Sequence, residues 1–252
     1  MKKIILTLSF ATLLLTSCSG SDDAPTPTSG GTMPSKIVTT FSTGQISTST
    51  FTYSGNKIIE ENIVPSSDFS KVKYTYTGDN ITKIEIFSGS NFSPAGGFNL
   101  TYENGKQKTS TEIAQAGYNG DLRKETFAYN ADGTVTRTSS GINQTTGVES
   151  ANGRQMKFTY TADLLTKTES ISAGVAGQVT NYTNDETKNQ AFKNVIGYGI
   201  IEERGNLRLS ENYVGNPLSN RTYVYNYNSS NFPAQVAMTA SGTQSNTRAF
   251  TY

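Results

Sequence analysis

The chain has 252 residues, with 21 Lys and Arg against 20 Asp and Glu, no His, no Trp and a single Cys. Its net charge of +1 gives no electrostatic case for nucleic-acid binding. The absence of His excludes Ser–His–Asp and Cys–His catalysis and every zinc site that needs imidazole. Thr, Tyr and Phe, which favour strands, are abundant, so the composition predicts an all-β protein without cofactor or metal.

The N-terminus predicts a lipoprotein signal peptide over residues 1–17. Lys2 and Lys3 form a basic start, and residues 4–15 are mostly Ile, Leu, Phe and Ala, as in the n-region and h-region of a secretory signal. This apolar run is shorter than the ~20 residues that a transmembrane helix needs. We therefore expect the segment to be an export signal.

Leu15-Thr16-Ser17-Cys18 closely resembles the lipobox of bacterial lipoproteins, in which an aliphatic residue and two small residues precede an acylated cysteine. The resemblance implies that Cys18 receives fatty acids such as palmitate and becomes the new N-terminus. Two or more acyl chains are enough for stable membrane anchoring. Because Cys18 is the only cysteine, the mature chain forms no internal disulfide.

Residues 18–35 carry the acylated cysteine and a Pro- and Gly-containing stretch that predicts a flexible tether. Within it, Ser21-Asp22-Asp23 is similar to the Ser and acidic residues that follow the cysteine in many Bacteroidetes lipoproteins. That likeness implies export to the outer face of the outer membrane, hence a lipid-anchored protein at the cell surface. The alternative is that the two acids only keep the linker soluble.

From residue 36 to 252 the sequence repeats one unit, an aromatic-x-Tyr followed by a turn and a β-branched stretch. Residues two apart on a strand share a face, so both aromatics of a unit point the same way. The Gly, Asn and Asp that follow supply the positive φ angles of tight turns. A gap of 67 residues between Tyr160 and Tyr227 indicates a degenerate unit near residues 178–182. The units end at Tyr53, Tyr76, Tyr102, Tyr129, Tyr160, Tyr227 and Tyr252.

The unit resembles the YD repeat of the Rhs family, most closely in residues 127–135, FAYNADGTV. The Asp that this repeat expects after the second aromatic is replaced throughout, by Asn130 in this unit. A closer likeness, over most of residues 36–252, is to uncharacterised Bacteroidetes lipoproteins with Tyr-rich hairpins. That resemblance implies an envelope location and a hairpin-built fold, and no established activity.

These patterns predict a predominantly antiparallel, strongly twisted sheet or open half-barrel of roughly ten to fourteen strands. Two segments depart from the repeat. Residues 184–218 are irregular, with a short helix expected over 184–192 because Asn184 or Asp185 is a suitable N-cap. Ala95-Gly96-Gly97 lacks the Lys-Ser/Thr of a phosphate loop and predicts a turn.

No pattern indicates catalysis. Paired acids such as Glu60-Glu61 are adjacent on a strand and face opposite sides, so they cannot act together on one substrate. The tyrosines form a predicted ladder that is either core or the lining of a ligand groove. Its members are Tyr53, Tyr76, Tyr102, Tyr129 and Tyr160.

The sequence therefore favours a non-catalytic binding or structural module at the cell surface, held to the membrane by its acyl chains. Its ligand would be an extracellular glycan, peptide or protein. The alternative is an envelope carrier of a lipid or other apolar ligand in the groove of the half-barrel.

Overall fold

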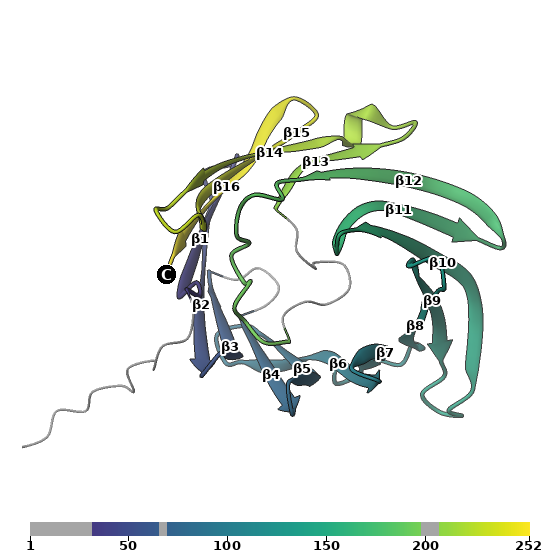
Figure 1. Ribbon diagram of the computed structural model, residues 1–252. Helices are drawn as coiled ribbons and strands as arrows, with labels where there is room; N and C mark the ends of the chain where they lie inside the picture. The colour runs from purple at the N-terminus through teal and green to yellow at the C-terminus, as the bar shows by residue number, and fades with distance from the viewer. Residues whose placement is uncertain (1–31, 66–69, 198–206) are drawn as a thin grey trace, which may run out of the picture.

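Each repeated unit except the last, which ends at Tyr252, closes the first strand of a hairpin, as its turn residues predict. The computed structural model describes residues 32–65, 70–197 and 207–252, and in it every strand is antiparallel to its neighbours in the chain (Figure 1). The strands are β1 (Lys36–Phe41), β2 (Ile46–Ser54), β3 (Lys57–Val64), β4 (Lys71–Thr77), β5 (Asn80–Ser88), β6 (Ser93–Glu103), β7 (Lys106–Ile113), β8 (Leu122–Tyr129), β9 (Val135–Ile142), β10 (Glu149–Thr161), β11 (Leu164–Ser172), β12 (Val175–Asn184), β13 (Arg208–Tyr213), β14 (Arg221–Tyr227), β15 (Pro233–Ala240) and β16 (Thr243–Thr251).

The sheet closes on itself, which corrects the prediction of an open half-barrel. β1 pairs with β16 from Lys36↔Thr251 to Phe41↔Asn246, and the ring contains sixteen strands, more than the sequence predicts. The alternation within a hairpin is the same in an open and a closed sheet, so it carries no information about this seam.

A repeated β-bulge explains why the units curve into a ring. The pairing register shifts beside the tyrosine in five hairpins, where one extra residue enters the return strand. Such bulges bend a strand and increase its twist, which is the curvature that barrel closure requires. The shifts lie at Thr52/Tyr53, Thr75/Tyr76, Thr101/Tyr102, Thr159/Tyr160 and Asn226/Tyr227.

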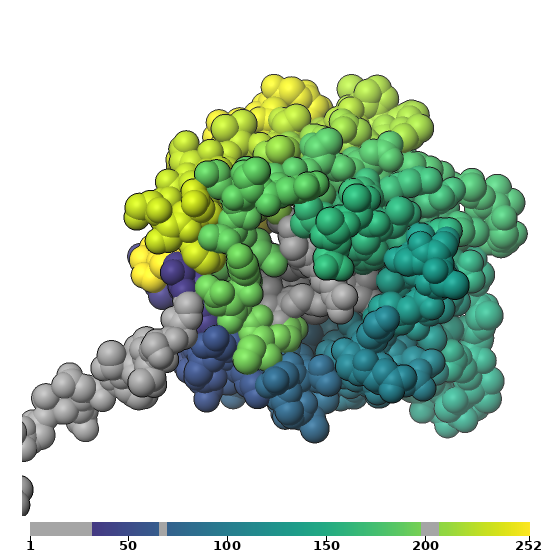
Figure 2. Space-filling view, in the orientation of Figure 1, coloured from purple at the N-terminus to yellow at the C-terminus, as the bar shows by residue number. Residues whose placement is uncertain are grey.

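The turns that follow the tyrosines gather at one end of the barrel, which we call the turn mouth. Gly55 and Gly78 adopt φ of 58° there, a left-handed conformation that favours glycine. Residues 185–197, which we call the strap, cross this mouth on the lumen side of β1 and β2 (Figures 1 and 2). At one end Asn189 N donates to Asn231 O at 3.0 Å, and at the other Ile196 N donates to Asn56 O at 2.8 Å.

The short helix predicted over 184–192 is wrong. The strap consists of turns and bends, and within the described part of 184–218 the one helical element is a 3₁₀ turn at Pro217–Ser219. The strap bonds its backbone groups to the barrel rim, so a helix is not needed to satisfy them. Ala95-Gly96-Gly97 likewise lies inside β6 and is not a turn.

The buried residues form two clusters on one face of the sheet. One gathers Phe127, Val135, Phe158 and Leu165, and the other Ile81, Ile84 and Leu100. Tyrosines of the repeated units pack against both, including Tyr182 from the degenerate unit predicted near residues 178–182.

Candidate functional site

The aromatic face of every repeated unit is the inner wall of the barrel. The strap lies inside the ring, and it meets Phe51 through Phe192, with ring centroids 5.3 Å apart. It also accepts a hydrogen bond from the Tyr76 hydroxyl at Ile196 O, 3.2 Å. Since residues two apart share a face, the Thr between the two aromatics of a unit points outward.

The predicted tyrosine ladder is therefore a ring inside the turn mouth, and the hydroxyls of four of its five members donate to backbone carbonyls. Tyr102 donates to Ile81 O at 2.9 Å and Tyr129 donates to Gln107 O at 3.1 Å. Tyr53 donates to Pro34 O at 2.7 Å, while Tyr160 packs in the Phe127 cluster. Each bond ties one hairpin to the segment beside it. Whether the ring also faces a ligand stays a prediction.

Burial keeps the phenols of Tyr53 and Tyr76 neutral. It raises the pKa of Tyr76 to about 12, against a hydrogen bond with the Ile58 backbone that lowers it. It also raises the pKa of Tyr53, with a smaller contribution from the charge of Glu61. Tyr53 and Tyr76 thus remain hydrogen-bond donors across the physiological pH range.

Basic residues are sorted by type between the two walls. Lysines in the middle of strands alternate with the inward aromatics and face outward, as Lys71 and Lys73 do beside Val72 and Tyr74. The described arginines all share the inward face, because directly opposite residues of paired strands lie on the same side. They are Arg123, Arg137, Arg154, Arg208, Arg221 and Arg248.

The inner wall is consequently cationic. Its strands carry these six arginines against four glutamates, which gives 6 − 4 = +2 over the described residues. Arg suits such a place because its weakly hydrated, planar guanidinium forms several directed hydrogen bonds, whereas Lys is strongly hydrated. The glutamates are Glu61, Glu112, Glu125 and Glu211.

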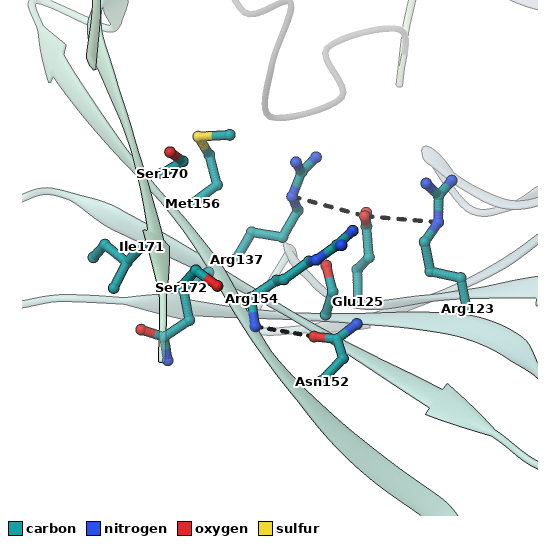
Figure 3. A pocket seen from close by; sticks show the side chains of 11 residues that line it. Arg123, Glu125, Arg137, Asn152, Arg154, Met156, Ser170, Ile171 and Ser172 are labelled. Carbon is teal, nitrogen blue, oxygen red and sulfur yellow. Dashed lines mark hydrogen bonds and ion pairs between the residues drawn. The ribbon is translucent and has the colours of Figure 1, made fainter. Parts of the chain in front are cut away.

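One cluster of these charges lines a cavity of about 390 Å³ beside β8–β11. Glu125 lies between two arginines, with its Oε1 3.8 Å from Arg123 Nε and 3.7 Å from Arg137 Nε. Figure 3 shows these three side chains pointing to the same side of the sheet. Arg123 and Arg137 also lie over the rings of Phe98 and Phe158, at 5.8 and 5.5 Å from the ring centroids.

Arg154 lines the same cavity from β10. Ser139 and Ser172 lie directly opposite it on the two neighbouring strands. Among the residues that the structure describes, none places a carboxylate within ion-pair distance of its guanidinium. From the part of the chain that the structure describes, three guanidinium groups and one carboxylate therefore line the cavity.

A second cluster surrounds Glu211 on β13, which is only 3% exposed. Its carboxylate accepts hydrogen bonds from Tyr223 at 2.8 Å, Tyr213 at 3.2 Å and Arg208 at 2.9 Å, and pairs with Arg221 at 3.4 Å. Burial alone would raise the pKa of Glu211, but the hydrogen bonds from Tyr223 and Arg208 and the two positive charges lower it below the ordinary value of 4.5. This carboxylate is fully occupied, so its cluster is structural.

A second cavity, of about 410 Å³, lies at the turn mouth between the β6–β7 and β8–β9 hairpins. Lys106 stands over the Tyr129 ring there, 4.9 Å from its centroid. Its rim includes the ion pair Lys108–Glu103, which is half-exposed on both sides. Lys108 is already paired with Glu103, whereas Arg154 has no described carboxylate partner, so we place the candidate site at the Arg154 cavity.

The arginines of the lumen were not among the predicted site residues, although the repeat carries a signal for them. In three units an arginine stands four residues before the first aromatic, which puts it on the aromatic face. Arg123 precedes Phe127 in this way, Arg154 precedes Phe158, and Arg221 precedes Tyr225. Glu125 lies on the same face between Arg123 and Phe127.

The predicted lipidation residue Cys18 and the export signal Ser21-Asp22-Asp23 lie outside the described residues. Within residues 32–65, 70–197 and 207–252, His, Cys, Asp and Glu nowhere form a group of three or more that could hold a metal ion. Over the same ranges, no helix is long and apolar enough to span a bilayer.

No known protein family matches the chain, and no curated protein matches it in sequence. Two solved structures share its fold. A porin-like protein from Bacteroides vulgatus aligns with a TM-score of 0.55 and 16% identity, over 88% of this chain and 99% of that one. A porin-like protein from Bacteroides uniformis aligns with a TM-score of 0.52 and 14% identity, over 86% and 97%. At this identity, the likeness shows a common barrel fold.

Proposed function

We propose that this protein is a non-catalytic binding module of the cell envelope, a barrel that stands in water on a lipid anchor and takes its ligand into the lumen. Cys18 is the acylated residue, residues 19–35 are the tether, and Ser21-Asp22-Asp23 directs the protein to the cell surface. The porin-like neighbours from Bacteroides support an envelope location.

The observation that carries the proposal is the polarity of the outer wall. Outward side chains form ion pairs along the strands, such as Lys71–Glu60 at 3.2 Å, Lys83–Glu85 at 2.7 Å and Lys167–Glu169 at 3.2 Å. A membrane-spanning barrel has the opposite pattern, with apolar residues facing lipid, and a lysine at the bilayer midplane costs about 2–4 kcal/mol. The charged wall therefore favours water on the outside.

The lumen supports binding of a polar ligand over an apolar one. Closure of the sheet removes the half-barrel groove in which a lipid carrier would hold its cargo. Aromatic side chains and the strap fill the inner wall near the turn mouth. The two cavities are lined by charged residues, Arg154 in one and Lys106 in the other.

The decisive experiment is to produce residues 19–252 without detergent. We expect a monomer by size-exclusion chromatography with light scattering, a β-type circular dichroism spectrum and cooperative unfolding in urea. Aggregation that only detergent reverses would contradict the water-facing wall.

The anchor is tested separately in a Bacteroidetes host. Labelled palmitate should be incorporated into the full chain and not into the Cys18→Ser variant, which should leave the membrane fraction. Ser19→Ala is the control and should behave as the parent chain.

For orientation, protease added to intact cells should remove the protein and spare a periplasmic control. Survival of the protein until the outer membrane is opened would overturn the surface location.

A further inference from the structure

We propose that the cavity beside β8–β11 binds a small, hydroxyl-rich oxyanion, a sugar acid or sugar phosphate, with the guanidinium of Arg154 as its anion receptor. The inference deepens the proposed binding function and rests on it. It depends on three features of the cavity, namely its unbalanced charge, the small residues around Arg154 and the absence of a stacking ring.

The charge balance leaves Arg154 available. Glu125 is the one carboxylate among the described residues that line the cavity, and it is already shared by Arg123 and Arg137. The charged lining residues therefore sum to 3 − 1 = +2. An arginine fork matches the paired oxygens of a carboxylate or phosphate, and such charge-assisted bonds are about twice as strong as neutral ones.

The neighbours of Arg154 leave room for a ligand. The opposite residues, Ser139 on β9 and Ser172 on β11, have short side chains, so nothing large covers the guanidinium from either strand. Their hydroxyls offer both donors and acceptors to sugar hydroxyl groups. The Ser170 hydroxyl already donates to Gln178 O at 3.3 Å, so it offers an acceptor. Met156 supplies the apolar contact on the same face.

A bulge in β10 aims Arg154 at this place. The register with β9 shifts between Ala151 and Arg154, and Gly153 adopts φ of 67° in the inserted stretch. Asn152 then accepts a hydrogen bond from Arg154 N at 3.0 Å (Figure 3). Bulges commonly re-aim a side chain next to a binding site.

The size and lining of the cavity define the class of ligand. A volume of about 390 Å³ lies in the range of small-molecule sites, roughly 300–1,000 Å³. None of the described residues that line it is aromatic, so among them a neutral sugar finds no ring on which to stack. Recognition must then come from the anionic group first and from hydroxyl groups second.

The test is isothermal titration of the mature chain, residues 19–252, with glucose 6-phosphate, glucuronate, glucose and inorganic phosphate at low ionic strength. We expect glucose 6-phosphate and glucuronate to bind and glucose not to bind. Arg154→Gln should weaken binding of both anions by tenfold or more, as loss of a charge-assisted hydrogen bond predicts. Lys108→Gln, which removes the same charge from the rim of the turn mouth, should leave both affinities within about twofold.

Three results would overturn the inference. They are equal binding of glucose and glucose 6-phosphate, equal weakening by the two substitutions, and no binding of either sugar anion. Inorganic phosphate that binds as tightly as glucose 6-phosphate would remove the sugar from the proposal. A detergent-free monomer that binds none of the four would contradict this inference without contradicting the proposed envelope module.

Because Arg154 is exposed and makes no ion pair with a described residue, its substitution should not disturb folding, which circular dichroism checks.

Discussion

At the scale of single residues, the lumen keeps charges that a protein interior would normally exclude. Glu211 is almost fully buried, yet its carboxylate is compensated by four partners. It accepts hydrogen bonds from Tyr213, Tyr223 and Arg208 and pairs with Arg221. Removing one partner of such a buried arrangement is strongly destabilising, because the remaining charges lose their compensation. The cluster therefore joins β13 to β14 where their ladder holds only two paired positions.

Glu211→Gln should lower the free energy of unfolding at pH 7 by on the order of 3 kcal/mol. Burial alone would raise the pKa of Glu211. The hydrogen bonds from Tyr223 and Arg208 outweigh burial and lower the folded-state pKa below 4.5. Its contribution is therefore complete above about pH 4.5 and is lost as the pH falls through the folded-state value.

Urea unfolding of the two proteins at pH 7 and at pH 3 measures this effect. The difference between parent and variant should shrink at the lower pH. Glu103→Gln, at a half-exposed pair on the rim of the turn mouth, serves as the control and should change stability by less than about 1 kcal/mol. A difference between parent and Glu211→Gln that is the same at both pH values would show that the carboxylate is not the source of the stability.

At the scale of elements, the sequence predicts the hairpin well because its signals are local. An aromatic-x-Tyr pair, a turn Gly and an alternating return strand all lie within about fifteen residues. The bulge beside Tyr53, Tyr76 or Tyr102 leaves no such mark, since Ile59, Thr82 and Lys108 are ordinary strand residues. The sequence pattern therefore could not predict the curvature of the sheet, which distinguishes a closed barrel from a half-barrel.

Gly96 and Gly97 show the same limit. In isolation two adjacent glycines indicate a turn, but in β6 they adopt φ of 110° and 150° and let the neighbouring strand come close. A Cβ on Gly97 would collide with the carbonyl of Ile84 and the Cα of Glu85 on β5. These contacts depend on pairing with β5, so the sequence of β6 alone does not indicate them.

Gly97→Ala should consequently destabilise the barrel by more than Gly105→Ala. Both positions have positive φ, which costs alanine roughly 1 kcal/mol, but a Cβ at Gly105 meets nothing within 4 Å. The excess at Gly97 is the backbone clash, for which we expect a further 1–3 kcal/mol or so. Thermal unfolding of the two variants measures it, and equal losses would place β5 and β6 farther apart than the structure has them.

At the scale of the whole molecule, the sequence could not predict which face of each strand points into the barrel and which points outward. A strand with aromatics on one face and Thr or Lys on the other has the same period of two whether the aromatics face lipid or lumen. Closure with the strap inside the ring resolves the choice, since Phe51 and Tyr76 meet the strap. The arginines then share the lumen, which no single unit reveals.

The closed ring itself depends on the seam between β1 and β16, which joins residues more than 200 positions apart in the chain. Val38 and Ala249 lie directly opposite each other there. Opposite residues of an antiparallel pair have Cα atoms about 4.5–5.5 Å apart, within the span of a disulfide. In a Cys18→Ser background, Val38→Cys with Ala249→Cys should therefore oxidise readily, giving faster migration on a non-reducing gel and no free thiols.

Val38→Cys with Thr247→Cys is the matched control. Thr247 lies on the same face, two residues along β16, where diagonal neighbours are about 7–8 Å apart and too far for an unstrained bridge. The Val38–Ala249 disulfide would close a loop of most of the domain and should raise the free energy of unfolding by on the order of 4 kcal/mol. An open half-barrel would keep β1 and β16 apart. Failure of the opposite pair to oxidise, or equal oxidation of both pairs, would therefore contradict the pairing of β1 with β16. It would also contradict the enclosed lumen on which ligand binding depends.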